Sequence, residues 1–165
     1  MRLSRRTLLG AALTGGSAVA VAGALPALAK PVELASETLV LVDPSVSSAF
    51  SEGLGRVWVG QVAIRPVTGS ETLGQAAAWL AAGPGRQVVG LVGDADGVIF
   101  QQRIERGSVR WMSSAHHAPG GGNRSGWEAA QGEGLGRIAQ GRSGSGLSVS
   151  GAGPAIPLMS FVVQS

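Results

Sequence analysis

Carboxylate and imidazole side chains stand beside three apolar runs of this chain. They are Asp43 after the run 38–42, Asp94 and Asp96 after the run 87–92, and His116 and His117 after the run 108–113. In open α/β sheets, ligands bind outside the carboxyl ends of the strands, so we expect these side chains to share one edge. Such groups can bind a divalent metal ion or transfer protons. The sequence therefore predicts a metal site formed by Asp94, Asp96 and His116, or an acid–base site at the same edge.

Each of these residues also has a simpler structural interpretation. Asp43 precedes Pro44 and can cap a helix that begins there. The stretch 94–97 lacks the later acidic positions of a calcium-binding loop and is also typical of a turn. Adjacent side chains of a strand point to opposite faces, so at most one of His116 and His117 can face a site, and both can be solvated loop residues.

The elements that must position these residues follow from the hydrophobic pattern. Apolar and β-branched runs predict strands over residues 38–42, 56–64, 87–92, 108–113 and 155–163. Helical spacing predicts a first helix from Pro44 to the glycines at 53 and 55, and a second that is capped by Ser70 and ends at Gly83. Residues 98–106 fit either a third helix or a hairpin, and their composition favours the helix.

Strands and helices that alternate along a chain are typical of an α/β fold. We expect a small three-layer domain with a mostly parallel sheet of four or five strands, the run 87–92 near its centre and the last strand antiparallel at an edge. Residues 38–118 would form the α/β core, and residues 154–165 would complete it. Between them, twelve of the 35 residues from 119 to 153 are Gly, which indicates a long Gly-rich loop or mobile segment. Residues 127–140 could form one loose helix, but their glycines argue against a firm one.

The first 29 residues have the three parts of a signal peptide. A basic start with Arg2, Arg5 and Arg6 precedes an apolar run rich in Gly and Ala, and Ala27 and Ala29 form an A-x-A cleavage pattern. The predicted cut lies after Ala29, and residues 30–37 would remain as a polar tether. The run is short and weakly apolar, so no stable membrane anchor is expected after cleavage.

The stretch Ser4-Arg5-Arg6-Thr7-Leu8-Leu9 resembles the twin-arginine (Tat) export signal. The arginine pair and the apolar pair Leu8-Leu9 carry the resemblance, although Leu8 stands where Phe is frequent and Gly10 where Lys is frequent. The resemblance implies recognition by the Tat export machinery and by signal peptidase, export in a folded state, and a periplasmic location. An ordinary Sec signal with a chance pair of arginines is the alternative. Beyond the leader, the chain resembles small Tat-exported proteins of no assigned activity only in general terms.

Composition narrows the remaining function classes. The chain has no Cys, which excludes disulfides, thiolate metal sites and lipid attachment through Cys. Residues 30–165 carry ten basic and ten acidic side chains, so no basic face for nucleic acid is expected. We expect the four tryptophans to pack in the core or at its edge: Trp58, Trp79, Trp111 and Trp127. We expect the side chains of Arg124, Arg137 and Arg142 to be exposed to solvent.

Two functions remain open. Small size, balanced charge and a Gly-rich arm favour a non-catalytic binding or accessory protein of the periplasm, which could dock to another exported protein or form part of a larger assembly. The alternative is a small metal-assisted hydrolase that uses the carboxylates and histidines at the edge of the sheet. The residues do not indicate a particular cofactor.

Overall fold

The computed structural model of the chain describes residues 38–60, 62–104, 109–142 and 152–165, all within one structural unit, Leu34–Ser165. The predicted signal peptide 1–29 and tether 30–37 lie outside the described residues, as do residues 143–151 of the predicted Gly-rich loop. Within the described residues, no helix has the length and apolar character needed to cross a membrane.

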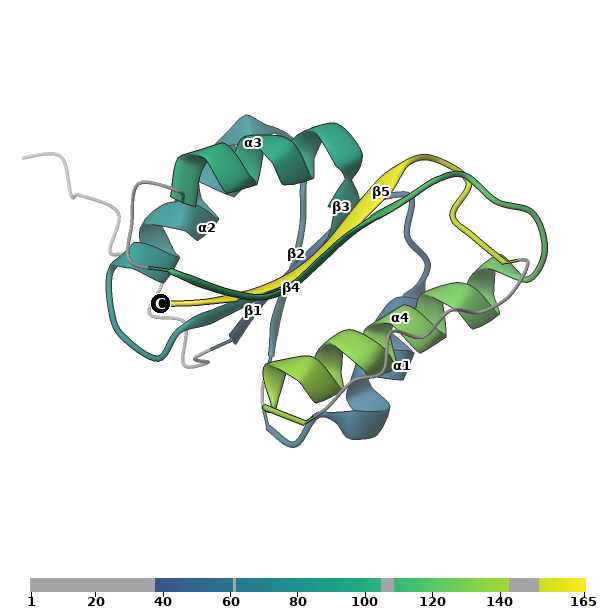
Figure 1. Cartoon of the computed structure of the whole chain (residues 1–165), viewed down its shortest axis with the longest axis horizontal. Helices are drawn as coiled ribbons and strands as arrows, with labels where there is room; N and C mark the ends of the chain where they lie inside the picture. Colours follow the sequence, from purple (N-terminus) through teal and green to yellow (C-terminus); the bar gives the residue numbers. More distant parts are fainter. Residues whose placement is uncertain (1–37, 61, 105–108, 143–151) are drawn as a thin grey trace, which may run out of the picture. The chain divides into compact units, whose positions relative to one another are not determined.

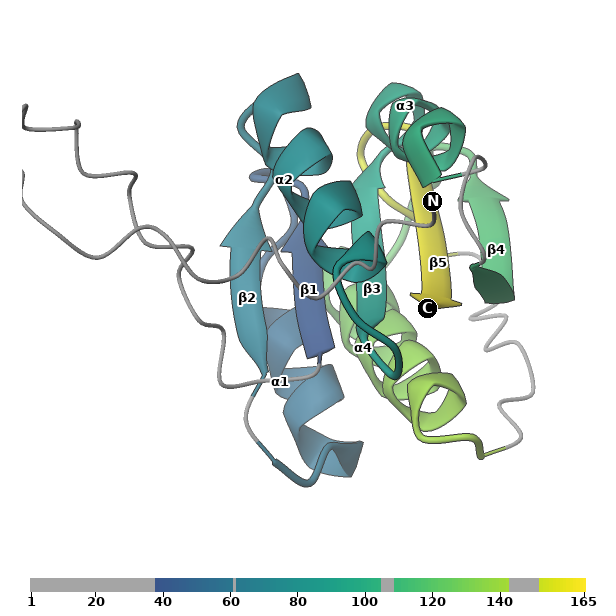
Figure 2. The same ribbon diagram turned by 90° about the vertical axis from the view of Figure 1, so that its left-hand side faces the viewer.

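Five strands form one sheet in the order β2-β1-β3-β5-β4 (Figures 1 and 2). They are β1 (Thr38–Val42), β2 (Ala63–Pro66), β3 (Gln87–Gly93), β4 (Arg110–His117) and β5 (Leu158–Gln164). β1 is parallel to β2 and β3, whereas β5 is antiparallel to β3 and β4. The α/β class and the central place of β3 are therefore confirmed.

The last strand departs from the prediction in its position. β5 is antiparallel, as expected, but it lies between β3 and β4 and not at an edge, so the sheet is mixed. Residues Leu158–Val163 are all buried, and burial on both faces is typical of an interior strand. The near-continuous apolar character of this run is the signal for its interior place.

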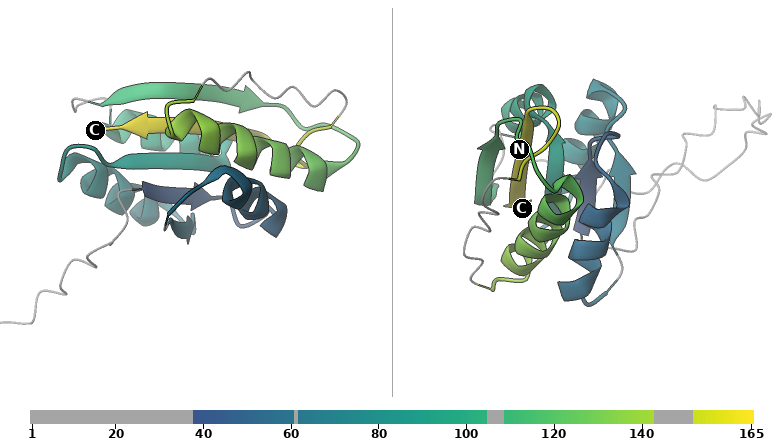
Figure 3. Two further views of the ribbon diagram at one scale, coloured as in Figure 1. Left: turned by 90° about the horizontal axis from the view of Figure 1, so that it is seen from below. Right: turned by 90° about the vertical axis from the view of Figure 1, so that its right-hand side faces the viewer.

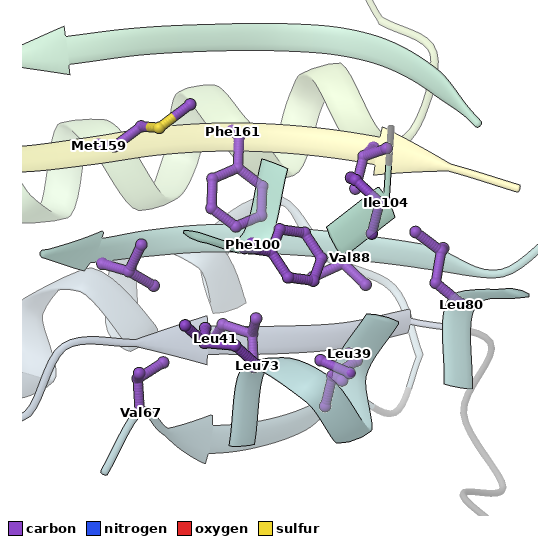
Figure 4. Close-up of a cluster of buried hydrophobic side chains, with 13 residues drawn as sticks. Leu39, Leu41, Val67, Leu73, Leu80, Val88, Phe100, Ile104, Met159 and Phe161 are labelled. Carbon is purple, nitrogen blue, oxygen red and sulfur yellow. The ribbon is translucent and has the colours of Figure 1, made fainter. Parts of the chain in front are cut away.

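Apolar side chains of the sheet alternate between two clusters, as the pleat of a strand requires. One cluster joins Leu39, Leu41 and Phe161 to residues of α2 (Ser70–Ala81) and α3 (Asp94–Ile104) (Figure 4). The other joins Val40 and Val162 to residues of α1 (Ser48–Val57) and α4 (Arg124–Ala139), which lie side by side (Figure 3). The core is thus divided between two pairs of helices.

The prediction of a Gly-rich loop is wrong for residues 124–139, which form α4, the longest helix described. Its glycines allow α4 to approach α1 closely. A Cβ atom at Gly132 would overlap the carbonyl oxygen of Phe50 and stand 2.8 Å from the backbone nitrogen of Leu54. A Cβ atom at Gly53 would overlap the carbonyl oxygen of Ala129. Tertiary packing therefore outweighs the low helix propensity of Gly in this segment.

Several element boundaries also differ from the predictions. The first helix begins at Ser48, with Ser47 as its N-cap, and continues through Gly53 and Gly55 to Val57. Gly69, and not Ser70, is the N-cap residue of α2. α3 follows β3 directly, so residues 94–97 form a helical turn, and the preference for a helix over a hairpin in 98–106 is confirmed for its described part.

Candidate functional site

The carboxyl ends of four strands lie at one edge of the sheet. β4 runs in the same direction as β3 because both are antiparallel to β5, and β1 and β2 share that direction. Asp43 follows β1, Asp94 begins α3 directly after β3, and His116 and His117 are the last residues of β4. The expected candidates therefore occur at the expected edge, but the histidines belong to the strand and do not follow it.

Asp94 and His116 form a direct pair. Nδ1 of His116 contacts Oδ1 of Asp94, and the two side chains are 60% and 41% exposed. A carboxylate only accepts hydrogen bonds, so this contact places the hydrogen of the neutral ring on Nδ1. Nε2 of His116 then has its lone pair available. The pair therefore presents a proton acceptor to solvent, held in orientation by a carboxylate.

Asp96 lies with Asp43 at Gly93, outside the pair formed by Asp94 and His116. Oδ2 of Asp43 and Oδ2 of Asp96 each lie 3.3 Å from the position that a Cβ atom of Gly93 would occupy. Burial raises the pKa of Asp96 above its ordinary value of 3.8, and the negative charge of Asp43 raises it further. Asp43 also accepts a 2.7 Å hydrogen bond from the backbone nitrogen of Ser45, so it caps a turn and not the helix that was predicted at Pro44.

His117 points to the opposite face of the sheet, toward α4. Its Nε2 lies 2.8 Å from Oγ of Ser160, a residue that is 2% exposed. Its ring and that of Trp127 form an edge-to-face pair with 5.1 Å between the ring centroids. Burial lowers the pKa of His117, and the neighbouring charge of His116 lowers it further. The prediction that the two histidines face opposite sides is confirmed.

The metal site of Asp94, Asp96 and His116 stays a prediction. Within the described ranges, no group of three or more His, Asp or Glu side chains is placed to hold a metal ion. Oδ1 of Asp94 is engaged by Nδ1 of His116, and Asp96 lies instead with Asp43. The arrangement of Asp94 and His116 is thus suited to proton transfer more directly than to a three-ligand metal centre.

Glu128 is a buried polar residue that the sequence patterns did not predict. Its side chain is fully buried and accepts hydrogen bonds from the backbone nitrogen of Ser47 at 2.9 Å, from the Ser47 hydroxyl, and from Nε of Arg124 at 2.8 Å. Arg124 also donates to the carbonyl oxygen of Ser45. These bonds fasten the segment that follows Asp43 to the start of α4. The spacing of four residues between Arg124 and Glu128 is the sequence signal for this pair.

Two other sequence expectations concern side chains away from the edge. Trp127 is buried and Trp79 packs partly buried against the α2–α3 cluster, as expected for packing residues. Arg137 pairs with Glu133 on α4 and is exposed, whereas Arg124 has the buried partner described above.

Comparison with known proteins gives no match, whether to a protein-family model, to a curated protein or to a solved structure. The class of protein is therefore defined by the chain's own residues. It is an α/β domain with a mixed five-stranded sheet and an exposed Asp–His pair at the carboxyl edge of that sheet.

Proposed function

We propose that this protein is a small exported hydrolase in which His116 acts as a general base at the carboxyl edge of the sheet. The observation that carries the proposal is the contact between Nδ1 of His116 and Oδ1 of Asp94. A carboxylate in this position holds the imidazole in one orientation and tautomer and stabilises the imidazolium that forms when Nε2 accepts a proton. Exposure of both side chains gives a substrate access to Nε2.

Asp94 is a positioning residue in this proposal. It touches His116 and not the reacting atoms, so its removal should reduce the rate without removing the base itself. General acid–base catalysis by one positioned group contributes roughly 10²–10⁴-fold to a rate. A bound metal ion, as the sequence suggested, would add a Lewis acid to this scheme, but the proton acceptor is present in the chain.

The test is hydrolysis of activated esters and phosphates by the purified protein, with p-nitrophenyl acetate and p-nitrophenyl phosphate as probes. We expect His116→Gln to remove activity on one of them, and Asp94→Asn to lower kcat by roughly 10²-fold or more with little change in KM. His117→Gln, on the opposite face of the same strand, is the matched control and should retain activity. Equal rates for the wild type and His116→Gln would overturn the proposal.

A non-catalytic binding or accessory function is the second candidate, and the carboxylate pair of Asp43 and Asp96 favours it. Neither side chain forms a salt bridge with a residue in the described part of the chain, and their mutual repulsion contributes to the raised pKa of Asp96. Such a pair suits a cationic group of a ligand or of an exported partner protein. A stoichiometric partner that co-purifies with the wild type and is lost with the double variant Asp43→Asn/Asp96→Asn would support this candidate.

We also infer that the domain is exported by the twin-arginine route to the periplasm and that its helices give it three layers. The first inference rests on Arg5, Arg6, Leu8 and Leu9 and on the small residues Ala27 and Ala29. The second rests on the division of the buried side chains between α2 with α3 and α1 with α4. A domain stabilised by its core without disulfides is compatible with export in a folded state.

A further inference from the structure

Asp94, His116 and Ser114 are associated with the same face of the sheet. Ser114 pairs with Phe161 and His116 with Met159, and both of these partners belong to the cluster beneath α2 and α3. Residues directly opposite each other in an antiparallel pair point to the same face, so Ser114 and His116 share it. Asp94 opens α3, which packs on this side of the sheet.

The register places these three residues at successive levels along the strands. Gly93 and His117 both pair with Leu158, so Asp94 stands one step further out, and its N–H donates to the carbonyl oxygen of Pro157 at 3.2 Å. His116 is level with Met159, and Ser114 is level with Phe161. His116 therefore lies between Asp94 and Ser114, with Ser114 about 6.6 Å along the strand from it.

The contact with Asp94 determines which ring nitrogen of His116 can accept a proton. Nδ1 of His116 contacts Asp94, which leaves Nε2, on the other side of the ring, as the nitrogen available to accept a proton from Ser114. Same-face neighbours at this separation are within reach of an aromatic side chain. Ser114 is exposed, so its hydroxyl is accessible to a substrate.

We propose that Ser114 is the nucleophile of an Asp94–His116–Ser114 line that hydrolyses esters through an acyl-enzyme. This proposal rests on the proposed function and deepens it, because it names the attacking atom and the substrate class. In this set the serine hydroxyl is the nucleophile, the histidine is the base that activates it, and the aspartate orients the histidine.

The reaction balances with water as the only co-reactant. Oγ of Ser114 attacks the carbonyl carbon of the ester while its proton passes to Nε2 of His116, and a new C–O bond forms. The ester C–O bond then breaks, and the alcohol leaves with the proton from Nε2. Water attacks the acyl group, its proton passes to Nε2, and the acid leaves as Oγ of Ser114 recovers a proton.

The test is covalent labelling of the full protein with a fluorophosphonate, followed by peptide mapping by mass spectrometry. We expect one adduct, located on Ser114, and a much slower reaction in His116→Gln. Ser114→Ala should lose the label, whereas Ser113→Ala, which alters the neighbouring serine on the opposite face, should keep it. A label on another serine, or no label on the wild type, would overturn the assignment.

A kinetic measurement separates this proposal from the proposed function. If Ser114→Ala keeps the ester hydrolysis that His116→Gln loses, the nucleophile is water, so the Ser114 assignment fails while the general-base proposal stands. If the wild type shows neither labelling nor hydrolysis, both proposals fail. If Ser114→Ala unfolds at the same temperature as the wild type, a loss of its activity results from the missing hydroxyl group and not from unfolding.

Discussion

At the scale of single residues, the two adjacent histidines have opposite environments. His116 is exposed and paired with a carboxylate, whereas His117 is half-buried between Ser160 and Trp127. The alternation of side chains along a strand could be predicted from the sequence, and so could the edge at which both residues lie. Which carboxylate meets His116 could not be predicted, because α3 begins directly at Asp94 and so places Asp94, and not Asp96, over β4.

The environment of His117 predicts a pH dependence of stability. Its folded-state pKa lies below the ordinary value of 6.5, so the unfolded chain binds more protons than the folded chain between these two values. The free energy of unfolding should therefore rise with pH across that window and be insensitive to this group above and below it. Thermal unfolding as a function of pH measures the effect.

The control for this prediction is His117→Gln, which cannot titrate. Its stability profile should be flatter than the wild-type profile just below pH 6.5. A wild-type profile that falls with rising pH over this range, or one that His117→Gln leaves unchanged, would show that this histidine does not couple to folding.

At the scale of elements, α4 shows most clearly what the sequence did not reveal. β1, β3 and α2 follow from apolar runs and helical spacing, because burial dictates both patterns. The glycines of α4 predict a loop by propensity, but Gly132 and Gly136 are contact positions against α1. Close packing of two helices depends on a partner segment distant in the sequence, so a local pattern cannot reveal it. The interior place of β5 was missed although its near-continuous apolar run is typical of a strand that is buried on both faces.

The glycine contacts between α1 and α4 predict opposite effects for two Gly→Ala substitutions. At Gly132 the added methyl group would meet the backbone of Phe50 and Leu54, so we expect a loss of about 1–3 kcal/mol or more. At Gly55 a Cβ atom would meet nothing within 4 Å, so the better helix propensity of Ala should stabilise the protein by up to about 1 kcal/mol. Chemical denaturation of the two variants measures both effects. A Gly132→Ala variant as stable as Gly55→Ala would contradict the close packing.

At the scale of the whole molecule, the proposal is a folded α/β domain delivered by a cleavable leader. The leader predicts that changing Arg5 and Arg6 together to Lys blocks export, because the Tat machinery recognises the arginine pair. The uncleaved precursor should then accumulate in the cytoplasm, while Arg2→Lys, outside the motif, should leave export intact. Cell fractionation with intact mass analysis measures this, and the exported form should begin at Lys30. Normal export of the Lys-Lys variant would indicate the Sec route.

The proposed chemistry depends on Asp94, which holds Nδ1 of His116 and leaves Nε2 as the proton acceptor. Long-range ¹⁵N–¹H NMR of the imidazole, at a pH where the ring is neutral, reports directly which nitrogen carries the hydrogen. We expect the Nδ1-protonated tautomer in the wild type, and we expect it to be no longer the dominant form in Asp94→Ala. A wild-type ring that carries its hydrogen on Nε2, or a tautomer unaffected by Asp94→Ala, would contradict it.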